Sequence, residues 1–267
     1  MKSNIIIAIV LLAAPMALFA QNSGDFAVPF SDPNKRGKVY AHLNSGSITI
    51  KGTGRKDVLV KYAGENDDDK DKGRNRDGLR RISGGTLDLQ VAESNNLIKI
   101  SSGSWNNSTN LEIEVPTGVD LKVHTDNDGT LRISNIQGEV ELDNYNGDIY
   151  ANNISGSAVA TSYNGEIKIT FDNVSPDTPM SYTTYNGDVD LSFPSTTKAT
   201  FKMKTNQGEI LSGFDMNLIR SEPIQKKDER SGVYKVTVND WVKGEINGGG
   251  PEIVMKSYNG DLYIRKK

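Results

Sequence analysis

The stretch GEVELDNYNGDIYANNISGSAVATSYNGEIKI, residues 138–169, decides the fold of this chain. It carries a glycine at every ninth position, and most of these glycines are followed by a polar residue and then by alternating apolar residues. The unbroken series consists of Gly129, Gly138, Gly147, Gly156 and Gly165. A fixed period is typical of repeat architectures, in which each unit buries its apolar face only against its neighbours.

The repeat continues beyond this block with longer spacings, at Gly187, Gly208 and Gly260. Inside the block, residues 135–138 (NIQG) match residues 153–156 (NISG), and residues 144–147 (NYNG) match residues 162–165 (SYNG). Both matches are offset by twice the glycine period, so the unit is predicted to consist of two nine-residue halves.

Two all-β architectures fit this pattern. In a β-solenoid each unit forms one coil, and equivalent residues stack about 4.8 Å apart. In an antiparallel meander each Asn-Gly pair forms a hairpin turn. Tyr145, Tyr163 and Tyr185 recur at equivalent places, which stacking explains and hairpins do not. We therefore predict a β-solenoid, single-stranded and β-helix-like, with short repeating coils of about 18–22 residues.

Alternating apolar residues also occur outside the block, and no helical periodicity is found after the N-terminal segment. Short strands are predicted at residues 39–43, 47–50, 58–62, 86–91, 97–100, 111–115, 119–123, 234–238 and 251–255. Segment 64–81 is almost entirely charged or glycine, and is predicted to be a mobile surface loop. The expected organisation is one β domain over 21–267, with its clearest repeats at 126–211 and C-terminal repeats at 233–267. The N-terminal strands and residues 258–264 are the candidates for capping the two ends, and the alternative is that they pair with another copy of the chain.

The alternation predicts the direction of the side chains within the repeats. Residues expected to point inward are Val140, Leu142, Ile149, Ala151, Ile167, Ile169, Val189 and Leu191. Residues expected to point outward are Glu141, Asp143, Asp148, Lys168 and Asp190. Asn144, Ser162 and Thr184 fall in the inward phase at a corner, where they either bond to the turning backbone or simply suit a turn. The glycines are expected to serve as turn residues because they tolerate positive φ.

The first twenty residues are typical of a secretory signal peptide. Lys2 supplies a positive charge, Ile5 to Leu12 are continuously apolar, and small residues lead to Ala20. An uncleaved anchor helix is the alternative, but the apolar run is short for a membrane span. We expect an exported protein without a membrane span after cleavage. The chain has no cysteine, so its fold contains no disulfide or thiolate metal site.

Several motifs in fixed order resemble a known family. They are residues 43–50 (LNSGSITI), 115–123 (VPTGVDLKV), the repeated Tyr-Asn-Gly-Asp/Glu, and residues 246–253 (INGGGPEI) followed by 257–264 (SYNGDLYI). Together they resemble the exported bacterial β-strand-repeat proteins described as candidate adhesins, a domain family of unknown function. This resemblance implies a β-solenoid-like fold and a place in the cell envelope or outside the cell. It implies no catalytic residue.

Candidate chemistry in the sequence is sparse. The two histidines, His42 and His124, lie far apart in the chain, and a histidine zinc site needs further ligands. Asp143, Asp148, Glu166 and Asp188 lie near equivalent corners, where stacked carboxylates suit calcium or a glycosidase acid pair. The favoured interpretation is that exposed acids keep strand edges soluble. We therefore predict no catalytic residue, no cofactor and no metal site.

The tyrosines are the strongest binding candidates. Tyr145, Tyr163 and Tyr185 are predicted to form an outer ladder, and Tyr258 repeats the same motif. Exposed rings suit contact with sugars or a partner protein. In the alternative interpretation, each ring only shields its own corner and stacks on its neighbour.

The net charge of −3 argues against nucleic acid as a partner. The leading functional hypothesis is a non-enzymatic, adhesin-like envelope interaction protein that binds an unknown protein or glycan through an extended β face. A polysaccharide-binding or polysaccharide-degrading protein is one alternative, and a periplasmic structural protein with a protein partner is another. The expected location is the periplasm or the cell surface.

Overall fold

The computed structural model describes residues 23–64, 89–103, 108–219, 224–227, 234–237 and 241–267. The predicted signal peptide and residues 65–81 of the charged segment lie outside this part of the chain. The described residues form strands and turns without any helix, as predicted for an all-β chain. Accordingly, the described part contains no helix of the length and apolarity that a membrane crossing requires.

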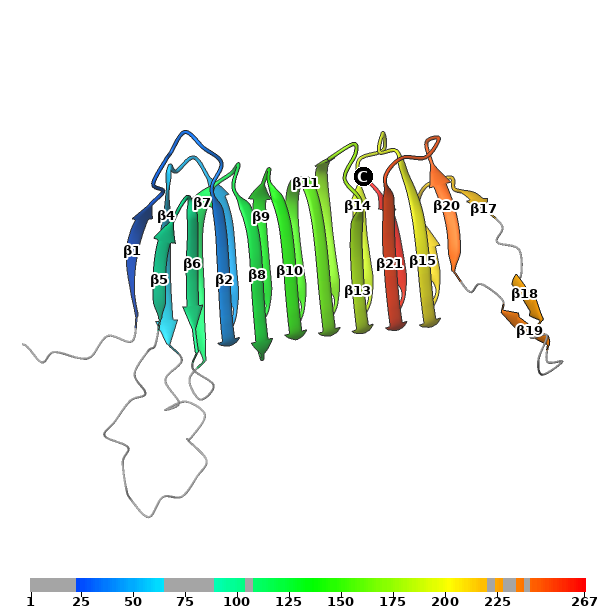
Figure 1. Ribbon diagram of the computed structural model, residues 1–267, viewed down its shortest axis with the longest axis horizontal. Helices are drawn as coiled ribbons and strands as arrows, with labels where there is room; N and C mark the ends of the chain where they lie inside the picture. Colours follow the sequence, from blue (N-terminus) through cyan, green and yellow to red (C-terminus); the bar gives the residue numbers. More distant parts are fainter. Residues whose placement is uncertain (1–22, 65–88, 104–107, 220–223, 228–233, 238–240) are drawn as a thin grey trace, which may run out of the picture.

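The strands form two sheets that face each other, one in front of the other in Figure 1, and both extend along the length of the molecule. One face, sheet B, contains β5 (Gln90–Ser94), β6 (Leu97–Ser102), β2 (Lys38–Ser45), β8 (Asp120–Asn127), β10 (Glu139–Asn146), the second half of β11 (Ile149–Asn164), β13 (Met180–Asn186), β21 (Glu252–Asn259), β15 (Ala199–Gln207), β20 (Val242–Ile246) and β17 (Asn217–Ile219).

The strands of the other face, sheet A, follow in the same order along the molecule, from β1 (Ser23–Pro29) onward. Sheet A contains β1, β4 (Asp57–Gly64), β7 (Thr109–Pro116), β3 (Ile48–Thr53), β9 (Leu131–Ile136), the first half of β11, β12 (Ile167–Val174), β14 (Val189–Phe193), β22 (Leu262–Lys266) and β16 (Ile210–Ser212). Strand β11 belongs to both faces and joins them. A separate hairpin consists of β18 (Ile224–Lys227) and β19 (Tyr234–Thr237).

Over residues 120–193 each repeat crosses sheet B and then sheet A, and pairs in parallel with the next repeat. Ile149 lies opposite Ile167, and Ile167 lies opposite Val189. These offsets equal the spacings between the glycines at positions 147, 165 and 187, so the glycine pattern gave the correct register and the arrangement is solenoid-like. The antiparallel meander is wrong for the repeat block. Antiparallel pairs occur at the ends of the stack, for example between β1 and β4 and between β15 and β20.

The coils do not stack in the order of the sequence. Strand β2 lies between β6 and β8, and β21 lies between β13 and β15 (Figure 1). The C-terminal repeat is therefore an internal coil, and the expectation that residues 258–264 cap one end is wrong. At that end the outer strands of sheet B are β20 and β17, which run antiparallel to their neighbours.

The two nine-residue halves correspond to two corners of each coil. At the corner from sheet B to sheet A, the glycines stack in a column whose order is Gly46, Gly129, Gly147, Gly165, Gly187, Gly260 and Gly208. Gly138 and Gly156 stack at the opposite corner. Close approach to the preceding coil requires glycine throughout the column, because an added Cβ at each member after Gly46 would lie about 2 Å from the carbonyl oxygen of the previous one. A positive backbone φ is a second reason for glycine at only some of these positions, for example at Gly147, where φ is 150°.

Small polar side chains satisfy the carbonyls of this corner. Asn144 Nδ2 donates to Gly129 O at 2.8 Å, Ser162 Oγ to Gly147 O at 3.2 Å, and Thr184 Oγ1 to Gly165 O at 2.9 Å. Of the two interpretations of these residues, bonding to the turning backbone is confirmed. Thr125, Thr205 and Ser257 make the same bond in other coils.

The core lies between the two faces, and all eight side chains predicted to point inward are buried. Of the residues predicted to point outward, Glu141, Asp143 and Lys168 are exposed and Asp148 is half-buried. Asp190 is the exception, with only 3% of its surface exposed. Its carboxylate lies 3.1 Å from Lys168 Nζ and 2.7 Å from Arg265 Nε. Arg265 covers it because β22 stacks beside β14, a pairing that the local alternation does not reveal.

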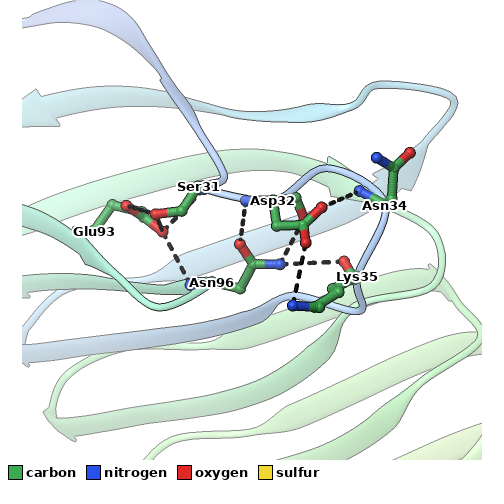
Figure 2. Close-up of polar contacts among 6 residues, drawn as sticks. All are labelled: Ser31, Asp32, Asn34, Lys35, Glu93 and Asn96. Carbon is green, nitrogen blue, oxygen red and sulfur yellow. Dashed lines mark hydrogen bonds and ion pairs between the residues drawn. The ribbon is translucent and has the colours of Figure 1, made fainter.

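A polar network holds the N-terminal end together (Figure 2). Ser31 Oγ donates to Glu93 at 2.7 Å, and Asp32 N donates to Asn96 Oδ1 at 2.7 Å. Asn96 Nδ2 returns a bond to Asp32 O at 2.7 Å. Hydrogen bonds from Ser31 lower the pKa of Glu93 below its usual value. The network fixes the β1–β2 connection onto the β5–β6 hairpin.

Candidate binding face

Four tyrosine rings form a continuous row on the outer face of sheet B. The ring centroids of Tyr145 and Tyr163 are 5.0 Å apart, those of Tyr163 and Tyr185 are 5.1 Å apart, and those of Tyr185 and Tyr258 are 4.8 Å apart. The planes of neighbouring rings differ by only 4° to 7°. Tyr258 completes the row because β21 lies beside β13. The predicted ladder is thus present in the structure, with a fourth ring.

The stacking limits what the rings can offer to a ligand. Carbon atoms in contact lie about 3.5–4.0 Å apart, so nearly parallel rings with centroids about 5 Å apart form an offset stack. Each ring covers part of its neighbour, as the alternative interpretation expected. Tyr145, Tyr163, Tyr185 and Tyr258 nevertheless remain 52%, 43%, 41% and 38% exposed. The row therefore presents ring edges, hydroxyl groups and partial ring faces.

An asparagine row holds the tyrosine row in register. Asn164 Nδ2 donates to Asn146 Oδ1, Asn186 Nδ2 to Asn164 Oδ1, and Asn259 Nδ2 to Asn186 Oδ1, each at 2.7 Å. Each asparagine directly follows one of the tyrosines in the sequence. This amide ladder fixes the spacing of the coils at the point where the rings emerge, so the exposed rings are preorganised.

A groove runs along one side of the tyrosine row. It has a volume of about 390 Å³, and its lining includes Asp143, Thr161, Thr183 and Lys256 together with the four rings. These four residues are neighbours in register on adjacent strands. The side chains along the groove therefore change from acidic, through hydroxyl, to basic along the axis of the stack.

At the acidic end of this groove the structure brings the two histidines together. His42 on β2 lies opposite His124 on β8, and their ring centroids are 4.8 Å apart. Their long separation in the sequence gave no indication of this contact. Asp126 lies within hydrogen-bonding distance of both rings, with its Oδ2 3.2 Å from His42 Nε2 and its Oδ1 2.8 Å from His124 Nε2. Sequence reasoning missed the cluster because β2 and β8 are direct neighbours in the sheet although about 75 residues separate them in the chain.

The acids that follow the corner glycines serve the backbone. Asp148 Oδ1 accepts a bond from Glu166 N at 2.9 Å, Asp188 Oδ1 from Asp261 N at 2.8 Å, and Asp261 Oδ1 from Glu209 N at 2.8 Å. The backbone bond from Glu209 lowers the pKa of Asp261 below its usual value. These carboxylates bind amides of the next coil, which gives them a structural role in addition to the predicted one in solubility.

The chain is similar to solved proteins of two bacteria and to one protein family. A solved protein of Clostridium sporogenes, described as a candidate cell adhesion protein, is 11% identical over 92% of this chain and 100% of its own, with a TM-score of 0.48. A candidate adhesin of Bacteroides fragilis is 12% identical over 92% of this chain and 96% of its own, with a TM-score of 0.38. No curated protein matches the chain. The model of the Toastrack DUF4097 family matches residues 21–247, and the chain therefore belongs to this family.

Proposed function

We propose that this chain is an exported, non-enzymatic repeat protein that binds a component of the cell envelope or cell surface through the outer face of sheet B. Stacked coils joined by parallel strand pairs form the rigid scaffold of this face. The observation that carries the proposal is the row of four exposed tyrosines held in register by the asparagine ladder. Preorganised aromatic side chains provide contact area with little loss of conformational entropy on binding.

The shape of the row favours an extended ligand over a compact one. Four rings at intervals near 5 Å form a strip along the stack, and the groove beside it is acidic at one end and basic at the other. Such a strip suits an elongated polymer or a polypeptide segment lying along the axis. The charge gradient would set the direction in which the ligand lies.

Polysaccharide binding is a second candidate function. It is favoured by Thr161 and Thr183, which line the groove beside the rings and supply hydroxyl groups for sugar contacts. A polysaccharide-degrading activity receives no comparable support, because the stacked carboxylates of Asp148, Asp188 and Asp261 bind backbone amides.

The proposal is tested by co-sedimentation of residues 21–267 with envelopes isolated from the producing organism and with purified envelope polysaccharides. A variant with Tyr145→Ser, Tyr163→Ser and Tyr185→Ser is expected to lose at least ten-fold in affinity. A control variant with Glu141→Ser and Val159→Ser alters exposed positions of the same face outside the row and is expected to bind like the native chain. Equal binding by the native chain and the correctly folded triple variant would contradict the proposal.

The location is tested separately by digestion of the tagged protein with protease on intact cells, with lysed cells as the control. Digestion on intact cells would support a role at the surface. Protection until lysis would favour a periplasmic partner, and would leave the tyrosine row as the contact to be tested against periplasmic components.

A further inference from the structure

The cluster of His42, His124 and Asp126 has the composition of a metal site. These are the only two histidines of the chain, and the structure places them beside each other on neighbouring strands. One nitrogen of each ring and a carboxylate oxygen of Asp126 all lie within 4.8 Å of one another. The side chains are between 26% and 30% exposed, so an ion could reach them from solvent.

The spacing of the donor atoms suits a small tetrahedral ion. Zinc bound to nitrogen or oxygen at about 2.0–2.1 Å separates neighbouring ligand atoms by roughly 3.3 Å. The carboxylate of Asp126 lies 3.2 Å from His42 Nε2 and 2.8 Å from His124 Nε2. Small adjustments of the side chains would therefore admit the ion between the three groups.

A further carboxylate lies where a supporting group of a metal site is expected. Asp143 Oδ2 is 3.4 Å from His124 Nδ1. The other ring nitrogen of His124, Nε2, faces Asp126. Histidines that bind metal almost always direct their second nitrogen toward such a partner, which fixes the tautomer and the orientation of the ring. Asp143 is thus a positioning residue for His124.

The donor set selects the class of ion. Two imidazoles and one carboxylate suit zinc and the neighbouring transition metals, whereas calcium requires six to eight oxygen ligands. We propose that His42, His124 and Asp126 bind a divalent transition-metal ion of the zinc class, with Asp143 orienting His124. The fourth coordination position would be open to water or to a group of a bound ligand. This proposal does not depend on the proposed function of the tyrosine row.

The test is titration calorimetry with zinc chloride on residues 21–267, purified without a histidine tag and treated with a chelator. Saturable binding of one ion per chain is expected. His124→Gln and Asp126→Asn are each expected to weaken binding at least ten-fold, and Asp143→Asn about ten-fold. Glu141→Gln is the matched control, because Glu141 lies on the same strand as Asp143 and pairs with Lys122. It is expected to bind zinc like the native chain.

Histidine ring signals in NMR provide a second readout, since both histidines belong to the cluster. Zinc is expected to shift the signals of both rings together. Absence of saturable binding by the folded native chain, or equal binding by the Asp126→Asn variant, would overturn the proposal. The triple tyrosine variant is expected to keep its zinc affinity, so failure of the site and failure of the binding face can be told apart.

Discussion

Gly147 lies directly against Gly129 of the preceding coil, so that a Cβ added at position 147 would be 1.9 Å from the carbonyl oxygen of Gly129. Backbone φ at Gly147 is 150°, a value that residues with a side chain rarely adopt. Two independent restrictions therefore require glycine at this corner. Since the corner repeats along the stack, the column of glycines sets how closely the coils approach.

Replacement of Gly147 by alanine is expected to lower the free energy of unfolding by about 2–4 kcal/mol, because the coils must separate locally and the backbone is strained. Urea unfolding monitored by circular dichroism measures the change. Gly118→Ala is the matched control, because an added Cβ there meets no atom within 4 Å. Its effect is expected to be within about 0.5 kcal/mol. Equal effects of the two substitutions would contradict the close-approach argument.

Asn144 is expected to be replaceable by threonine but not by alanine. Its Nδ2 donates to Gly129 O, while its buried Oδ1 has no partner in the described structure. Thr184 makes the equivalent bond to Gly165 O through its hydroxyl. Asn144→Ala should therefore cost about 1–3 kcal/mol of unfolding free energy, and Asn144→Thr less than about 1 kcal/mol. Thermal and urea unfolding check both values, and a threonine variant as unstable as the alanine variant would refute this reasoning.

The local features of the fold were predictable from the sequence because they depend on neighbours close in the chain. Alternation placed Val140 and Leu142 in the core, and the glycine period gave the offset between coils. The order of the coils was not predictable in this way. The motif around Tyr258 and Gly260 resembles those around Tyr163 and Gly165, so its local pattern fits beside several coils equally well. The choice depends on contacts between distant segments.

The same limit applies to the candidate sites. The tyrosine row was visible because Tyr145, Tyr163 and Tyr185 recur within the continuous repeat block. The histidine cluster was not visible in the sequence, because His42 and His124 are brought together only by the pairing of β2 with β8. A signal was present in the alignment of residues 39–43 with residues 121–125, which have the same alternation and a histidine at the fourth place.

Among the residues of the N-terminal network, Asn96 is expected to contribute most to the free energy of unfolding. It is buried, has φ of 62°, and exchanges hydrogen bonds with the backbone of Asp32. Asn96→Ala removes these bonds and leaves the half-buried backbone N–H and C=O of Asp32 without their side-chain partner, which should cost about 1–3 kcal/mol. Hydrogen exchange is expected to increase first in the β1–β2 connection. Asn34→Ala is the control, since only the backbone amide of Asn34 is used in the network, and it should leave exchange unchanged.

Tyr150 is expected to ionise late in an alkaline titration. Burial and the hydrogen bond to Asp148 raise the pKa of Tyr150 to about 12. Because the folded state favours the neutral phenol, Tyr150 contributes to the free energy of unfolding. This contribution is complete below the unfolded pKa of about 10 and is lost as the pH rises through about 12. Absorbance of phenolate at 295 nm should show this step, and Tyr150→Phe should remove it. If the variant instead lost a phenol that ionises near the ordinary tyrosine pKa of about 10, the assignment would be contradicted.

Cross-linking tests whether the C-terminal repeat lies inside the stack. Thr183 on β13 lies opposite Lys256 on β21, which in turn lies opposite Lys204 on β15. Neighbouring strands are about 4.8 Å apart, so cysteines at 183 and 256 are within reach of a short thiol cross-linker, whereas cysteines at 183 and 204 are about twice as far apart. The chain has no cysteine of its own, so each engineered pair can be read directly. Thr183→Cys with Lys256→Cys is expected to cross-link rapidly, and Thr183→Cys with Lys204→Cys at least ten-fold more slowly. The reverse order of rates would mean that the coils stack in sequence order and that Tyr258 does not belong to the row.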